Sequence, residues 1–294
     1  MHITEGSLEF LGYSTYYRIT GSCRCGKKPL LLLHGGPGST HNYFEVLDPL
    51  AEEDGRALIM YDQLGCGRSQ APGRTDLFNM QTWLAELIQL RTALGLENCH
   101  ILGHSWGGML LLEYLCAEHP QGISSIILSS TLPSTSLWGS EQRRLLLNLP
   151  HEMQDAVAEA DRTGEYTSEA YRAANAEFMH RYCGPDITAS SPDCLTRKKH
   201  AGSEAYLTAW GQNEYTPTGN LKYFDRTADL VSIHVPALVC SGASDMCTPL
   251  IADTLQNGIP GAERVLFEHS RHTAYVEETG RYIEVLKDWL NRHD

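Results

Sequence analysis

The sequence lacks both a long apolar run and an excess of positive charge. No stretch approaches the roughly 18–20 consecutive apolar residues that a membrane-spanning helix needs, so the sequence predicts no transmembrane anchor. Lysine and arginine number 23 against 36 aspartates and glutamates, which leaves a formal net charge of −13. A chain this acidic is poorly suited to bind the phosphates of nucleic acids or of anionic membrane surfaces. We therefore expect neither nucleic acid nor a membrane among its partners.

The sequence also shows no targeting pattern and no framework of paired cysteines. The residues from Met1 to Gly6 contain no basic region followed by an apolar core, as a secretory signal would. The nine cysteines are an odd number, and most stand in apolar contexts, as Cys240 does. This usage predicts a reduced, cytoplasmic protein. Cys23 and Cys25 have no evident second ligand pair, so we expect no metal site there.

Short apolar runs alternate with helical patterns through the first part of the chain. The first twenty residues alternate apolar and polar positions around Gly12, which predicts a β-hairpin. Apolar residues recur with helical period from Met80 to Leu94. Continuous apolar runs that predict buried strands occupy residues 29–34, 57–62, 99–102 and 126–128. The alternation predicts an α/β fold with a mostly parallel sheet covered on both faces.

The composition changes from about Pro133 to about Thr227. This segment is polar and mostly helical in pattern, with one candidate helix from Glu169 to Cys183, and it contains no evident buried strand. Buried-strand patterns return at residues 236–240 and 264–267, and an amphipathic helix from Tyr282 to Leu290 follows. The sequence therefore predicts a core domain formed by residues 1–132 and 228–294, with a helical cap domain, residues 133–227, inserted into it.

The most informative segment is residues 99–108, where a strand pattern leads through Gly-His-Ser-Trp-Gly into a helical run, Met109 to Glu118. This is the nucleophile-elbow pattern, in which a serine sits on a sharp strand-to-helix turn. Side chains at Gly103 and Gly107 would collide with the neighbouring strand and helix. The helix N-terminus behind the turn favours developing negative charge. The pattern predicts Ser105 as a catalytic nucleophile.

A nucleophilic serine needs a base, and the base needs an orienting acid. In this fold the acid follows the first strand after the insert and the histidine follows the next strand. Asp245 and His272 occupy those two places. His269 remains the runner-up for the base, whereas Asp253 lies too far into the following helical run to compete for the acid.

Acyl chemistry also requires hydrogen-bond donors for the oxyanion. The backbone N–H of Trp106, directly after the serine, is one candidate. The second should come from the loop after an earlier strand, and residues 34–38, His-Gly-Gly-Pro-Gly, stand at such a strand end. Because glycines let the backbone approach a substrate closely, we assign Gly36 as the second donor and Gly35 as a substrate contact. This chemistry requires no metal and no organic cofactor.

With these motifs in place, the chain resembles the α/β-hydrolase superfamily, and within it the proline iminopeptidase family (peptidase family S33). The loop at residues 34–38 and the Tyr-Asp-Gln-Leu-Gly-Cys-Gly-Arg-Ser stretch at residues 61–69 are similar to that family's signatures. The elbow differs, because His104 stands where the family usually has glycine. Residues 213–219 resemble the archaeal tricorn-interacting aminopeptidases.

The resemblance implies that Ser105, His272 and Asp245 act as nucleophile, base and orienting acid in the release of an N-terminal residue. It also implies that Glu214, in the cap, holds the free α-amine of a small peptide or an amino-acid amide or ester. Aromatic residues of the insert, Tyr206 and Trp210, are candidates for the wall of the acyl pocket, with core packing as the alternative.

One position departs from the family pattern. Close relatives often carry a second amine-binding glutamate directly after the catalytic aspartate, and here that residue is Met246. Glu204 is a candidate replacement from the insert. The departure leaves open a second function, an esterase or amidase acting on a small acyl substrate without a free α-amine. A ligand-binding receptor on a hydrolase scaffold is a third reading, which the complete Ser-Asp-His set disfavours. The oligomeric state is not encoded in these patterns.

Overall fold

The computed structural model describes residues 2–24 and 26–294. Cys25 lies outside the described residues, so the prediction that Cys23 and Cys25 hold no metal stays a prediction. The strands are β1 (Ile3–Phe10), β2 (Tyr13–Thr20), β3 (Leu30–Leu33), β4 (Leu58–Tyr61), β5 (Cys99–His104), β6 (Ile123–Ser129), β7 (Ala237–Gly242) and β8 (Glu263–Phe267). The α-helices are α1 (Asp48–Asp54), α2 (Met80–Ala93), α3 (Trp106–Glu113), α4 (Thr135–Leu146), α5 (His151–Thr163), α6 (Glu169–Tyr182), α7 (Asp193–Thr196), α8 (Ser203–Ala209), α9 (Pro249–Gly258), α10 (Ala274–Glu277) and α11 (Thr279–Arg292). Short 3-10 helices lie at His41–Leu47 (η1), Thr75–Leu77 (η2) and Thr227–Ser232 (η4), and a π-helical turn at Tyr114–Glu118 (η3) follows α3.

The strands form one sheet in the order β1-β2-β4-β3-β5-β6-β7-β8. The hairpin β1–β2 forms as predicted, and β2 pairs antiparallel with β4. The six strands from β4 to β8 along the sheet are parallel to one another. The predicted fold class, an α/β-hydrolase fold with a mostly parallel sheet, is confirmed.

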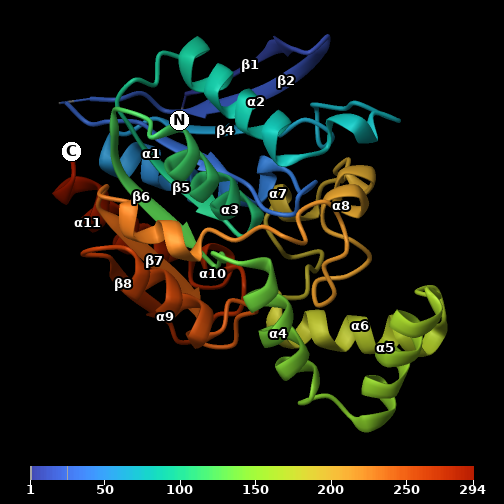
Figure 1. The fold of residues 1–294 in the computed structure, drawn as a ribbon. Helices are drawn as coiled ribbons and strands as arrows, with labels where there is room; N and C mark the ends of the chain where they lie inside the picture. The colour runs from blue at the N-terminus through green and yellow to red at the C-terminus, as the bar shows by residue number, and fades with distance from the viewer. Residues whose placement is uncertain (1, 25) are drawn as a thin grey trace.

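The continuous apolar runs are explained by burial on both faces of the sheet (Figure 1). Within β3, Leu31 and Leu33 belong to the core layer that contains residues of α2 and α3. Leu30 and Leu32 belong to the opposite layer, which contains residues of α1 and α11. Because successive side chains of a strand point to opposite faces, a strand covered on both sides must be apolar throughout.

The segment between β6 and β7 carries the helices α4 to α8. In its described residues the only strand-like pairing is an isolated bridge between Ser134 and Asp225. In Figure 1, α5 and α6 project from the body of the molecule beyond α4. The limits of a separate cap domain, at residues 132 and 228, remain a prediction. No helix in the described part of the chain is both long enough and apolar enough to cross a bilayer.

Two helices differ from their predicted bounds. The helix after the elbow begins at Trp106 and changes to a π-helical turn at Tyr114. The last helix begins at Thr279 and is separated from the short α10 by Glu278, whose backbone is not helical. The carboxylate of Glu278 accepts hydrogen bonds from the His269 N–H and the Ser270 hydroxyl. These bonds join Glu278, at the break between the two helices, to the loop that follows β8.

Candidate active site

Ser105 lies at the turn between β5 and α3 with φ of 54° and ψ of −123°, a region that side chains with a Cβ rarely adopt. A Cβ on Gly107 would lie 2.1 Å from the Leu33 carbonyl oxygen. A Cβ on Gly103 would lie 2.5 Å from the Gly107 carbonyl oxygen. The turn therefore closes only because both flanking residues are glycines, which leaves the serine at the sheet edge.

Asp245 and His272 are in direct contact beyond the ends of β7 and β8. His272 Nδ1 lies 2.7 Å from Asp245 Oδ1, and the Asp245 side chain has no exposed surface. The carboxylate also accepts hydrogen bonds from the backbone N–H groups of Gly242 and Cys247, at 3.1 and 2.8 Å. An ionised carboxylate can only accept, so Nδ1 carries the proton and His272 Nε2 is left free to act as a base.

The alternatives for base and acid lie elsewhere. His269 is exposed and absent from the lining of the pocket that holds Ser105, whereas Ser105 and His272 both line it. Asp253 is half exposed and pairs with Arg264. No hydrogen bond joins the Ser105 and His272 side chains among the described residues. Catalytic hydrogen bonds are often long or poorly aligned in enzymes without substrate, so this does not argue against His272 as the base.

His104, the residue before the serine, contacts the backbone of His272. Its Nε2 lies 2.9 Å from the His272 carbonyl oxygen, which can only accept, so His104 donates. Burial lowers the pKa of His104 to about 3, and the side chain is therefore neutral at all ordinary pH values. The bond anchors the backbone of His272. The two residues are 168 positions apart in the chain, so no local sequence pattern could have indicated this contact.

The two predicted oxyanion donors lie on loops that touch each other. A Cβ on Gly35 would lie 3.1 Å from the Ser105 Cβ, so this loop passes directly against the serine. The N–H groups of Gly36 and Trp106 have no acceptor among the described residues. For Trp106 this follows from its place as the first residue of α3, since the first N–H groups of a helix lack intrahelical partners.

Gln63 connects the two loops and was not singled out by the sequence. It is buried, and its Nε2 donates to the His34 carbonyl oxygen at 3.0 Å, while its backbone N–H donates to His34 Nε2 at 3.1 Å. Its Oε1 accepts from Trp106 Nε1 at 2.7 Å. One side chain thus fixes both the residue before Gly35 and the residue after the nucleophile.

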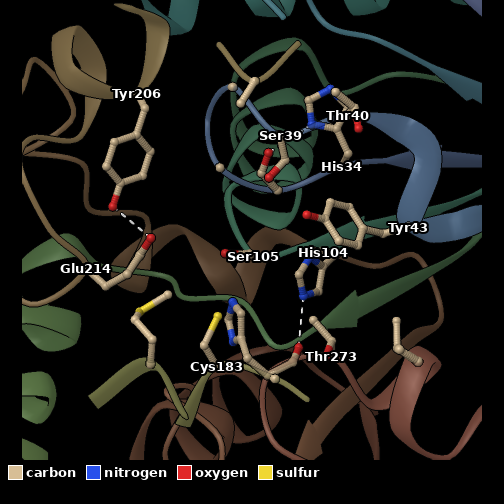
Figure 2. Close-up of a pocket in the computed structure, with 18 of the residues that line it drawn as sticks. His34, Ser39, Thr40, Tyr43, His104, Ser105, Cys183, Tyr206, Glu214 and Thr273 are labelled. Carbon is tan, nitrogen blue, oxygen red and sulfur yellow. Dashed lines mark hydrogen bonds between the residues drawn. The ribbon is translucent and has the colours of Figure 1, made fainter. Parts of the chain in front are cut away.

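A cavity of about 770 Å³ opens over Ser105 (Figure 2). Gly35, Gly36, Tyr206 and Glu214 line it. Tyr206 donates a hydrogen bond of 2.7 Å from its hydroxyl to Glu214 Oε1. Burial raises the pKa of Glu214, although this hydrogen bond and the nearby His272 oppose the shift. The structure thus places a carboxylate of the insert in the same cavity as the serine.

Three further candidate residues have definite places in the structure. Trp210 is buried and absent from the cavity lining; its ring meets that of Trp138 edge-on at 6.2 Å. The prediction that Trp210 contacts substrate is therefore corrected to core packing. Glu204 is exposed and accepts from the Gly73 N–H, so it does not replace a second amine-binding glutamate. Met246 does line the cavity.

One buried group of residue types that bind metals lies beside the site, formed by His34, Asp62 and Cys66. Its atoms are already engaged. His34 Nε2 accepts from Gln63, and Asp62 accepts from both the backbone and the ring of His41. Burial also raises the pKa of the Cys66 thiol well above its usual value, which disfavours the thiolate that metals prefer. We assign no metal to this group.

Comparison with known proteins shows the family of the chain. The model of the alpha/beta hydrolase fold matches residues 28–279. A proline iminopeptidase of Clostridium botulinum is 58% identical over 294 residues, which is the whole of both chains. Among solved structures, the proline iminopeptidase of Mycobacterium smegmatis has a TM-score of 0.87 at 30% identity and covers 99% of this chain and 98% of its own. VinJ has a TM-score of 0.90 at 30% identity, with 99% of both chains covered. The chain belongs to the proline iminopeptidase family of the α/β-hydrolase fold.

Proposed function

We propose that this chain is a serine aminopeptidase that releases N-terminal proline, or another apolar residue, from small peptides and amino-acid amides through an acyl-enzyme. The observation that carries the proposal is the Glu214 carboxylate, held by Tyr206 in the same cavity as Ser105. An anion at that place can bind the ammonium group of a peptide N-terminus. Proline is the residue named for the Clostridium botulinum and Mycobacterium smegmatis relatives.

In the acylation step, Ser105 Oγ attacks the carbonyl carbon of the first residue while His272 Nε2 takes the hydroxyl proton. The resulting imidazolium is stabilised by Asp245, and the N–H groups of Gly36 and Trp106 hold the oxyanion. His272 then gives its proton to the leaving amine, the C–N bond breaks, and the acyl group remains on Ser105. General-base catalysis of this kind contributes typically 10²–10⁴-fold to the rate.

In the deacylation step, a water molecule gives a proton to His272 and attacks the ester carbonyl. Collapse of the second tetrahedral intermediate returns the proton to Ser105 and frees the amino acid. The charged amine stays paired with Glu214 through both steps. Each oxyanion donor is worth about 3–4 kcal/mol of barrier reduction in enzymes of this type.

Met246 supports the alternative function, an esterase or amidase for acyl groups without a free amine. It is 1% exposed, lines the cavity and offers no charge at the place where the family resemblance implies a second amine-binding carboxylate. Among the described residues that line the cavity, Glu214 is then the carboxylate shielded from solvent that can select a charged amine, because Asp186 is exposed.

The deciding experiment compares proline, leucine, alanine and phenylalanine p-nitroanilides with their N-acetyl forms, with the Ser105→Ala variant as the blank. We expect turnover of the free-amine substrates only, with proline the best. Equal turnover of the blocked substrates would instead establish the esterase or amidase.

A substitution tests the amine site itself. Glu214→Gln should raise KM for free-amine substrates by about ten-fold or more, because an ion pair with a partly buried carboxylate is lost. Glu204→Gln is the matched control, since Glu204 lies outside the cavity and should leave KM unchanged. An unchanged KM in Glu214→Gln would remove this residue from the amine site.

A further inference from the structure

The cavity over Ser105 is larger than one amino acid requires and carries opposite charges. Apart from histidines, the described lining residues include two carboxylic acids, Glu214 and Asp186, and one amine, Lys199. Asp186 is exposed and paired with His180 at 3.2 Å. Glu214 and Lys199 are therefore the two charges without a counter-ion in the cavity wall.

Lys199 has no carboxylate within salt-bridge distance among the described residues. Its Nζ donates to the Leu195 carbonyl oxygen at 3.1 Å and lies 4.0 Å from the centre of the Tyr43 ring. Burial lowers the pKa of this ammonium group, so the site gains from an anion. Lys199 is thus a half-buried cation in the wall of the cavity that also contains Ser105, and it has no paired carboxylate among the described residues.

Glu214 and the tyrosine that contacts Lys199 lie on opposite sides of Ser105 in the view of Figure 2. In Figure 2, Ser105 lies between Glu214 on one side and Tyr43 on the other, and the Lys199 ammonium stacks on the Tyr43 ring. A substrate whose amine is bound by Glu214 and whose carbonyl carbon meets Ser105 therefore extends its leaving group toward Tyr43 and Lys199.

The segment that carries Lys199 is fixed against the core. The Gly202 N–H donates to the Gly38 carbonyl oxygen at 2.7 Å, and the Gly67 N–H donates to the His200 carbonyl oxygen at 2.7 Å. Arg197 forms an ion pair with Glu45 in η1. Lys199 is thus held by bonds on both sides of it in sequence, which gives its ammonium group a defined position.

Unpartnered hydroxyl groups accompany the lysine. Ser39 and Tyr43 line the cavity, and neither hydroxyl has a hydrogen-bond partner among the described residues. Thr40 Oγ1 is buried and also lacks a partner. A cation with several free hydroxyl donors is the set that binds a carboxylate.

We propose that Lys199, with the hydroxyls of Ser39 and Tyr43, forms a subsite for the C-terminal carboxylate of the leaving peptide. Resting on the proposed aminopeptidase function, this assigns short zwitterionic peptides, of two or three residues with a free C-terminus, as the substrate class. Glu214 binds the positive end of such a peptide, Lys199 binds the negative end, and Ser105 attacks the carbonyl group between them.

The test compares Pro-Ala and Pro-Ala-Ala as free acids with the same peptides as C-terminal amides. In the unmodified enzyme we expect KM for the better free acid to be at least about ten-fold below KM for its amide. Lys199→Met keeps the aliphatic stem on Tyr43 and removes the charge. This substitution should raise KM for the free acid to that of the amide. It should leave KM for proline p-nitroanilide unchanged, because that substrate has no carboxylate.

Lys198→Met is the matched control, because Lys198 is adjacent and exposed but absent from the lining of the cavity. It should change none of these constants. Equal KM for acids and amides, or equal losses for both in Lys199→Met, would overturn the subsite. If proline p-nitroanilide is still hydrolysed in that case, the aminopeptidase proposal stands; if no proline substrate is hydrolysed by the unmodified enzyme, that proposal fails instead.

Discussion

The hydrogen bond from Tyr206 to Glu214 should set the pH range in which the enzyme accepts a charged amine. Glu214 must be ionised to bind an ammonium group, yet burial raises its pKa, and the Tyr206 hydroxyl at 2.7 Å opposes that shift. A hydrogen bond to a charged group is worth about 1.5–3 kcal/mol, and one pKa unit corresponds to about 1.4 kcal/mol. Tyr206→Phe should therefore raise the pKa of Glu214 by roughly one to two units.

The sign of the effect follows directly. A higher pKa leaves Glu214 protonated up to a higher pH, so activity is lost earlier as the pH falls. The acidic limb of kcat/KM for proline p-nitroanilide, which reports the free enzyme, should move to higher pH by about one to two units. Tyr215→Phe is the control, because the Tyr215 hydroxyl bonds to Asn175 and lies outside the cavity lining. An acidic limb that stays in place in Tyr206→Phe, or moves to lower pH, would refute the reasoning.

Two other predictions concern residues buried behind the site. Gln63→Leu removes the side-chain hydrogen bonds to His34 and Trp106, so kcat should fall by about 10- to 100-fold with KM changed little. Steady-state kinetics measure both constants. Ser125→Ala is the control, because it also loses buried hydrogen bonds, to His100 and Trp289. A normal kcat in folded Gln63→Leu would show that the loops hold without it. Burial raises the pKa of Glu86 to about 7, so the free energy of unfolding should decrease between about pH 5 and pH 8, by up to about 3 kcal/mol. Urea denaturation at both pH values should show this decrease reduced in Glu86→Gln, and an equal decrease in both proteins would exclude Glu86 as its source.

The parallel strands were predictable because a strand buried on both faces of a sheet requires a short, unbroken apolar run. Few other secondary-structure elements require such a run. Leu30–Leu33 and Leu58–Tyr61 lie within the predicted ranges for this reason. Ser105 was recognisable because the sharp turn requires glycines at fixed places on both sides. In each case a local physical requirement limits which residues the sequence can carry.

Features that depend on distant contacts were not predictable. Trp210 and Tyr206 are both aromatic residues of the insert, and only the packing shows that one is buried against Trp138 while the other reaches Glu214. No local sequence pattern around Gln63 predicts its hydrogen bonds to His34 and Trp106. The assignment of Glu214 over Glu204 likewise came from resemblance to a family and not from any property of the two glutamates.

The close approach of Gly202 to Gly38 has a consequence for how this enzyme could change its substrates. A Cβ on Gly38 would lie 2.4 Å from the Gly202 carbonyl oxygen, and a Cβ on Gly202 would lie 2.5 Å from the Gly65 carbonyl oxygen. Three backbones therefore meet at the wall of the cavity, which Gly38 and Gly202 both line, with almost no room for a side chain. A methyl group on Gly202 would have to push these loops apart, and one on Gly38 would also be strained, because its φ is +93°. Changing which substrates this part of the cavity admits would therefore require the loops to move, and not only the exchange of side chains.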